Sequence, residues 1–182
     1  MNKKICFSLL IMNLTARGWA AMGTAEIRGT GDNTVPMGTV HFEDTPAGLK
    51  IQAQLANVPP GVHAFHIHES GSCADTGKAA GGHYSPMHAP HGQVLKEGLA
   101  HAHAGDLGNV TAGKDGSATL AAMVPGVTLA EGAYTVAGRA VILHEKVDDF
   151  SQPVGNAGSR IACGPILLIA GPAVSAPLPP AK

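Results

Sequence analysis

Short runs in which apolar side chains alternate with small or polar ones occur along most of this chain. We predict strands over the following segments: 38–43, 49–56, 63–68, 117–123, 133–137 and 139–144. Turn-forming residues such as Thr45-Pro46-Ala47-Gly48 and Lys114-Asp115-Gly116 separate them. Because side chains of a strand point alternately to two faces, this pattern is typical of an all-β sandwich or barrel.

Two long connections interrupt this rhythm. The first, residues 69–116, holds five of the ten histidines, and the second, residues 145–158, holds Asp148, Asp149 and several glycines. Long loops in a compact β domain usually carry binding or catalytic groups. We therefore expect the chemistry of the protein to lie in these two loops.

The two ends of the chain differ in composition from its middle. The first twenty residues contain Lys3 and Lys4, an apolar run, and small residues at 18 and 20, which is typical of a secretory signal peptide. The alternatives are a buried helix or a membrane anchor, but the apolar run is too short to span a bilayer. The end of the chain is rich in Pro and Ala. We predict a signal peptide at 1–20, one β domain at 21–170 and a disordered tail at 171–182.

Composition argues against a nucleic-acid partner and favours metal binding. The 182 residues suit one domain, and 12 basic side chains stand against 13 acidic ones. Loss of the first twenty residues would leave 9 basic side chains against 13 acidic ones, which provides no basic surface for a polyanion. Charged residues make up only 14% of the chain, yet it has ten histidines and 24 glycines. This combination favours a metal over a polyanion as the partner.

Two cysteines, Cys73 and Cys163, would remain after signal-peptide removal. An exported protein with two cysteines usually pairs them. The two are 90 positions apart, and closing a loop of that length removes about 4–5 kcal/mol of unfolded-state entropy in the chain-entropy model. A pair of metal thiolates is the alternative. We rank it lower because the histidines already offer enough ligands.

The histidines occur in patterns that suit a metal centre. His66 and His68 are two positions apart in a predicted strand, so both imidazoles project from one face, while Phe65 and Ile67 face the core. Further candidate ligands are His83, His91, His103 with Asp106 three positions later, and His144. Three nitrogens and a carboxylate suit a closed zinc site, whereas imidazoles alone suit copper(II). His88 and His101 lie close enough in sequence to compete for zinc, and His63 is interpreted as a packed structural histidine.

Five segments in a fixed order carry a family resemblance. They are HAFHIH at 63–68, GGHYSP at 81–86, HAGDLGN at 103–109, GRAVILHEKVDD at 138–149 and GNAGSRIACG at 155–164. Over roughly residues 25–168 the chain resembles copper–zinc superoxide dismutase of the exported bacterial kind. The resemblance implies a Greek-key β-barrel of about eight antiparallel strands with two long functional loops. Ala64 departs from the family pattern, which usually has Gly there.

The resemblance also implies an activity, cofactors and site residues. Superoxide would be converted to oxygen and hydrogen peroxide in the periplasm, at a copper joined to a structural zinc through one histidine. The implied copper ligands are His66, His68, His83 and His144, and the implied zinc ligands are His83, His91, His103 and Asp106. Asp148 would join His66 to His91, Cys73 and Cys163 would form a disulfide, and His83 and Arg160 would be catalytic, Arg160 binding the anion. Candidates for steering superoxide are Lys78, Lys96 and Lys146.

Other readings remain open from the sequence. An exported copper- or zinc-binding module without turnover would need the ligands but neither Arg160 nor a bridging His83. A cupin-type dioxygenase also uses an H-x-H strand, but needs a glutamate facing the same way, whereas Glu69 directly follows His68. Superoxide is the expected partner, with no nucleic acid and no membrane span. The protein could be a homodimer or a monomer, and His41, His88 and His101 have no assigned role.

Overall fold

The first strands of the chain form a continuous antiparallel meander. The computed structural model describes residues 20–31 and 34–169. Within β2 and β3 buried and exposed side chains alternate, and the turn at Pro46-Ala47 sets Thr45 opposite Gly48. The strands are β1 (Met22–Gly29), β2 (Pro36–Thr45), β3 (Gly48–Leu55), β4 (Gly61–His68), β5 (Asp106–Ala112), β6 (Ala118–Val124), β7 (Ala140–His144), β8 (Arg160–Pro165) and β9 (Leu167–Ile169).

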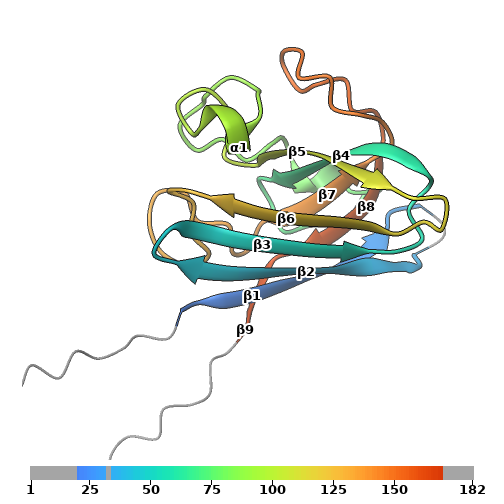
Figure 1. The fold of residues 1–182 in the computed structure, drawn as a ribbon, viewed down its shortest axis with the longest axis horizontal. Helices are drawn as coiled ribbons and strands as arrows, with labels where there is room; N and C mark the ends of the chain where they lie inside the picture. The colour runs from blue at the N-terminus through green and yellow to red at the C-terminus, as the bar shows by residue number, and fades with distance from the viewer. Residues whose placement is uncertain (1–19, 32–33, 170–182) are drawn as a thin grey trace, which may run out of the picture.

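The strands close almost fully into a barrel (Figure 1). Their order is β5-β4-β7-β8-β1-β2-β3-β6, and β9 pairs with β1 beyond β8. The connections from β3 to β4 and from β6 to β7 cross between non-adjacent strands, which gives the Greek-key arrangement. The predicted all-β barrel of about eight antiparallel strands is therefore confirmed.

The barrel interior is filled by large apolar side chains. Phe42, Ile51, Phe65 and Ile67 are fully buried there, and burial of each such side chain contributes about 1.5–3 kcal/mol. Because Phe65 and Ile67 point inward from β4, the residues between and after them point to the opposite face. The core thereby fixes the direction of the two histidines of that strand.

Both long loops lie on the same side of the barrel (Figure 1). The first carries a short 3-10 helix, η1 (Lys78–Ala80), and one turn of helix, α1 (Val94–Glu97). Cys73 of this loop is bonded to Cys163 of β8. The disulfide thus anchors the first loop to the barrel wall, as the resemblance implied.

Some expectations from the sequence are wrong. Residues 133–137 are no sheet strand, because their backbone bonds within the same connection, with Val136 N–H donating to Thr128 O and Thr128 N–H to Tyr134 O. The first loop ends at Asp106 rather than at residue 116, because residues 106–112 pair with β4 as strand β5. Strands β1, β8 and β9 also lie outside the six predicted segments.

The predicted signal peptide and tail fall outside the described residues, except for Ala20. Among the residues that are described, no helix is long and apolar enough to cross a membrane.

Candidate metal centre

Four histidines converge beneath the two long loops. His66 and His68 lie on β4, His144 ends β7, and His83 follows η1. β4 and β7 are paired antiparallel, which brings His144 beside the β4 histidines. One ligand atom of each ring lies within 4.8 Å of the others, and the Nε2 atoms of His68 and His144 are 3.3 Å apart. These four rings, called the copper group below, suit copper(II).

A second set of ligand atoms shares His83 with the first. It contains His83, His91, His103 and Asp106, whose ligand atoms also lie within 4.8 Å of one another. Asp106 Oδ1 is 2.8 Å from His83 Nδ1, and Asp106 Oδ2 is 2.9 Å from His91 Nδ1 and 3.1 Å from His103 Nδ1. Three imidazoles and one carboxylate suit zinc. This set is called the zinc group below.

One carboxylate connects the two groups from outside. Asp148 Oδ2 is 2.8 Å from His66 Nε2, and Asp148 Oδ1 is 2.9 Å from His91 Nε2. Asn109 fixes the backbone of Asp148 at two points: its Oδ1 accepts from Asp148 N–H at 2.7 Å, and its Nδ2 donates to Asp148 O at 3.0 Å. This role of Asn109 was not predicted from the sequence.

The unpaired Nδ1 atoms of His66 and His91 indicate whether the two groups of ligand atoms suit metal ions. Both Nδ1 atoms are buried without a hydrogen-bond partner, and a buried unpaired polar atom costs about 1–3 kcal/mol. His91 Nδ1 is near Asp106 Oδ2, but the two atoms lack hydrogen-bond geometry. In each ring Nε2 faces Asp148, which leaves Nδ1 for the metal group. The donor set therefore fits a copper and a zinc.

Burial favours the neutral form of three rings of the copper group, His68, His83 and His144. Desolvation lowers the pKa of His68 to about 2 and that of His144 to about 3, and neighbouring imidazoles add to the effect. Desolvation also lowers the pKa of His83. Neutral imidazole is the form that binds a metal, so these rings need lose no proton at neutral pH.

The zinc group contains an ionised carboxylate and a protonated imidazole. Burial alone would raise the pKa of Asp106, but hydrogen bonds with His103 and His83 and the close imidazole of His91 hold it well below its usual range. Burial alone would lower the pKa of His91, but the close carboxylate of Asp106 and the hydrogen bond with Asp148 outweigh it and raise the pKa to about 9. In the metal-free protein His91 is therefore the cation that balances the two carboxylates.

The turn that carries His83 is held from three sides. His68 forms an isolated β-bridge with His83, and Gly82 N–H donates to Glu69 Oε2 at 2.9 Å. The carbonyl oxygen of Gly81 accepts from His68 Nδ1 at 3.0 Å and from Arg160 Nη2 at 2.6 Å. Because His68 Nδ1 donates there, its Nε2 is the atom left for the copper group. The contribution of Glu69 was not predicted.

Arg160 lies at the exposed side of the copper group. A cavity of about 390 Å³ is lined by His68, His83, His144 and Arg160. Arg160 also lines a second cavity of about 500 Å³, together with Lys78. An anion entering either cavity meets the same guanidinium.

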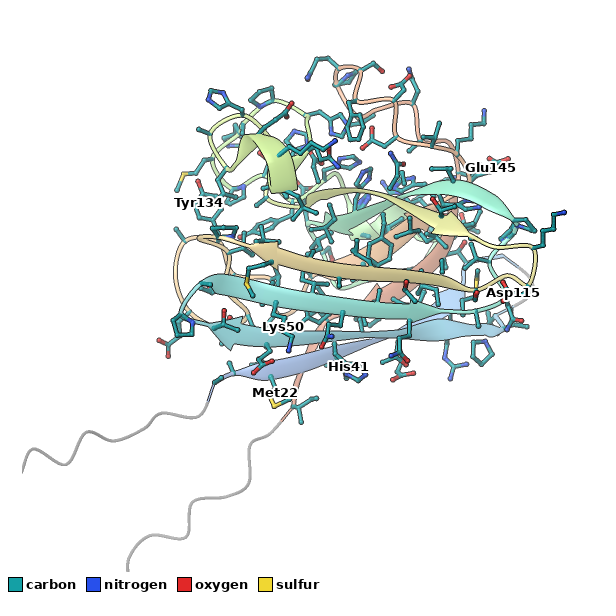
Figure 2. All side chains as sticks on the ribbon, viewed as in Figure 1. Met22, His41, Lys50, Asp115, Tyr134 and Glu145 are labelled. Carbon is teal, nitrogen blue, oxygen red and sulfur yellow. A yellow bond between two sulfur atoms is a disulfide. The ribbon has the colours of Figure 1, made fainter. Side chains whose placement is uncertain are left out.

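The remaining histidines lie outside both groups. His88 and His101 are exposed and belong to neither set of ligand atoms, so the competition for zinc that their spacing would allow does not arise in this arrangement. His41 is exposed on the outer face of β2, far from the loops (Figure 2). The His63 ring lies 2.9 Å from His144 O and 2.8 Å from Pro59 O, as expected for a packed structural histidine.

Comparison with known proteins identifies the family. A family model described as copper/zinc superoxide dismutase matches residues 36–166. The chain belongs to this family. Every residue of the copper group and the zinc group lies within the part that matches the copper/zinc superoxide dismutase model.

Individual relatives agree with this membership. The chain is 37% identical over 137 residues to an extracellular superoxide dismutase [Cu-Zn] of Caenorhabditis elegans, covering 71% of this chain and 60% of the relative. It is 34% identical over 141 residues to superoxide dismutase [Cu-Zn] 2 of Mesembryanthemum crystallinum, covering 74% and 88%. The alignment thus spans less than two thirds of the nematode protein but most of the plant one.

Solved structures of the same fold are also similar. The crystal structure of the clock protein EA4 has a TM-score of 0.72 at 30% identity, covering 84% of this chain and 97% of that one. A superoxide dismutase-like protein from Bacillus subtilis has a TM-score of 0.68 at 31% identity, covering 78% and 95%. The nearly closed barrel is therefore also the architecture of these two proteins.

Proposed function

We propose that this protein dismutates superoxide to oxygen and hydrogen peroxide with one copper and one zinc per chain. The observation that carries the proposal is the shared ring of His83, which contributes to both groups of ligand atoms. A single imidazole that holds two ions needs both of its nitrogens, and His83 presents Nδ1 to Asp106 while its other side faces His66 and His68.

We assign copper to His66, His68, His83 and His144, and zinc to His83, His91, His103 and Asp106. When bound, copper supplies a centre that can take up and return one electron, while zinc has no redox chemistry and is structural. The overall reaction consumes two superoxide anions and two protons and yields one oxygen and one hydrogen peroxide. The protein must therefore bind an anion and move protons.

Proton handling falls to His83. Its pKa is lowered mainly by burial, so in the metal-free protein the ring is neutral at neutral pH and one of its nitrogens carries no proton. Its Nδ1 is held toward Asp106, so Nε2 is the atom that would take a proton and pass it to the reduced product. The cavity beside His83 brings that atom within reach of a small substrate.

Anion binding falls to Arg160. Its guanidinium donates to Gly77 O at 2.6 Å and to Gly81 O at 2.6 Å, which fixes its direction at the cavity rim. Guanidinium stays charged at all physiological pH values, so it can attract superoxide whatever the state of the imidazoles. Lys78, in the adjoining cavity, would add to this attraction.

We further propose that the protein is exported and works in the periplasm, after removal of a signal peptide at 1–20 from the domain at 21–170. The disulfide between Cys73 and Cys163 supports an oxidising compartment. Two nematode relatives are named extracellular, which also supports export.

The proposal is tested by metal analysis together with superoxide consumption on the purified exported form. We expect one copper and one zinc per chain, superoxide consumption, and loss of activity on chelation with return on copper addition. A metal-binding module without turnover is the alternative. Such a module would show the same metal content but would consume superoxide no faster than buffer without protein.

A further inference from the structure

The side chain of Gln152 forms hydrogen bonds with both backbone polar groups of His91, a member of the zinc group. His91 N–H donates to Gln152 Oε1 at 3.2 Å, and Gln152 Nε2 donates to His91 O at 2.7 Å. The two residues are 61 positions apart and belong to different long loops. His91 lies in no helix or strand, so this two-point contact replaces the support that regular structure would give.

Two other residues of the second loop contact the imidazole ring of His91. Asp148 Oδ1 is 2.9 Å from His91 Nε2. The Phe150 ring lies nearly parallel to the imidazole, at 20° and 6.4 Å between centroids. The ring is thus oriented by Asp148, while its main chain is fixed by Gln152.

His91 also borders open space. A cavity of about 490 Å³ is lined by His91, Phe150 and Gln152, with Glu97 and His101 on its other walls. If the contact with Gln152 were lost, the main chain of His91 could shift toward this cavity instead of meeting packed core. The fixed position of His91 therefore depends on the side chain at position 152.

We propose that Gln152 is a positioning residue for zinc: it fixes the main chain of His91 so that Nδ1 stays directed at the zinc group. The inference rests on the proposed zinc site. Partners that orient metal ligands typically change metal affinity by 10–100-fold when removed. Gln152 acts on the backbone of a ligand rather than on its ring, so we expect the lower end of this range.

The test compares zinc release from the copper- and zinc-loaded protein and its Gln152→Leu variant, with excess 4-(2-pyridylazo)resorcinol as the zinc acceptor. Leucine has a similar size but forms no hydrogen bonds. We expect about tenfold faster zinc release from the variant, with unchanged copper content. Gln152→Asn, which is one methylene shorter, provides the same comparison if the leucine variant does not fold.

Two control variants separate positioning from general disturbance. Ser151→Ala changes the neighbouring residue, which bonds only within its own loop, and Gln54→Leu removes an exposed carboxamide on β3. Both should release zinc at the wild-type rate. Cobalt(II) in the zinc group gives a second measurement, because its absorption bands report ligand geometry and should shift only in the Gln152 variants.

Equal release rates for wild type and Gln152→Leu, or equally fast release from Ser151→Ala, would overturn the inference and leave the proposed function intact. Unshifted cobalt bands with a lower melting temperature of the metal-free protein would show a purely structural role, and would also overturn it. A wild-type protein that binds no zinc would overturn the proposed zinc site itself, and the inference with it.

Discussion

A Cβ atom on Gly155 would lie 1.8 Å from Oδ1 of Asp148. It would also lie 2.7 Å from His91 Nε2, so the second loop passes too close to the carboxylate for any side chain. Gly155 has a φ of 73°, a backbone conformation that residues other than glycine rarely adopt. The contact between Asp148 and His91 thus depends on a glycine that follows them in the chain.

We expect Gly155→Ala to destabilise the protein and to lower its zinc content. The matched control is Gly138→Ala, because Gly138 has a φ of 77° but no atom within 4 Å of its added Cβ. Overpacking of this kind costs about 1–3 kcal/mol, so Gly155→Ala should lower the free energy of unfolding by that much more than the control. Urea unfolding of both metal-free variants measures it, and equal losses would contradict the close approach.

Asp148→Asn should weaken zinc binding by about 10–100-fold. An amide presents one oxygen and one NH₂ group, so it cannot accept from both His66 and His91, and the charge that favours their orientation is lost. The adjacent Asp149 contacts only residues of its own loop, which makes Asp149→Asn the matched control. Competition against a zinc chelator measures both affinities, and a similar loss in the two variants would argue against the bridge.

Arg160→Ala should lower kcat/KM for superoxide with copper and zinc content unchanged. A charge-assisted hydrogen bond contributes about 1.5–3 kcal/mol, so we expect at least a tenfold loss. Arg160→Lys, which keeps the charge, should recover part of the rate. Pulse radiolysis on metal-analysed samples gives the rates. An alanine variant with the wild-type rate would exclude the proposed role in anion binding.

Lys78→Glu should reduce the rate of reaction with superoxide and weaken its dependence on salt. Lys78 shares a cavity with Arg160, whereas Lys96 lies on α1 at the other side of the first loop, so Lys96→Glu carries the same charge change as a control. We expect a roughly threefold lower rate at low ionic strength for the first variant only. Rates measured over a range of salt concentrations decide between the two lysines.

Zinc binding to the metal-free protein should become stronger as pH rises toward about 9. The pKa of His91 is raised to about 9, since its contacts with the carboxylates of Asp106 and Asp148 outweigh burial. At neutral pH the zinc must therefore displace a proton from this ring, and affinity should rise about tenfold per pH unit below that pKa. Calorimetry in two buffers of different ionisation enthalpy counts the released protons. A release of none at pH 7 would contradict the raised pKa.

Strand geometry made part of the site predictable from sequence. His66 and His68 are two positions apart in a strand, so their shared face follows directly from backbone geometry. Residues 133–137 have a similar alternation but bond within their own connection, and no local pattern distinguishes these outcomes. The choice of His91 over His88 likewise came from the family pattern and not from spacing.

The long-range contacts that the second loop makes with the rest of the site could not be predicted. Gln152 and Asn109 act through paired hydrogen bonds to backbone groups 61 and 39 positions away. Carboxamides are common in loops and turns, so their residue types give no sign of a distant partner. Only the folded barrel shows which loop segments face each other.

The carbonyl oxygen of Gly81 accepts one hydrogen bond from His68, a ring of the copper group, and another from Arg160. If His68 and Arg160 have the roles proposed above, retention of copper and capture of the substrate anion are coupled through this one main-chain atom. A sequence change that displaces this atom would alter both properties at once, so natural variation in substrate attraction is expected at peripheral positions such as Lys78 rather than here.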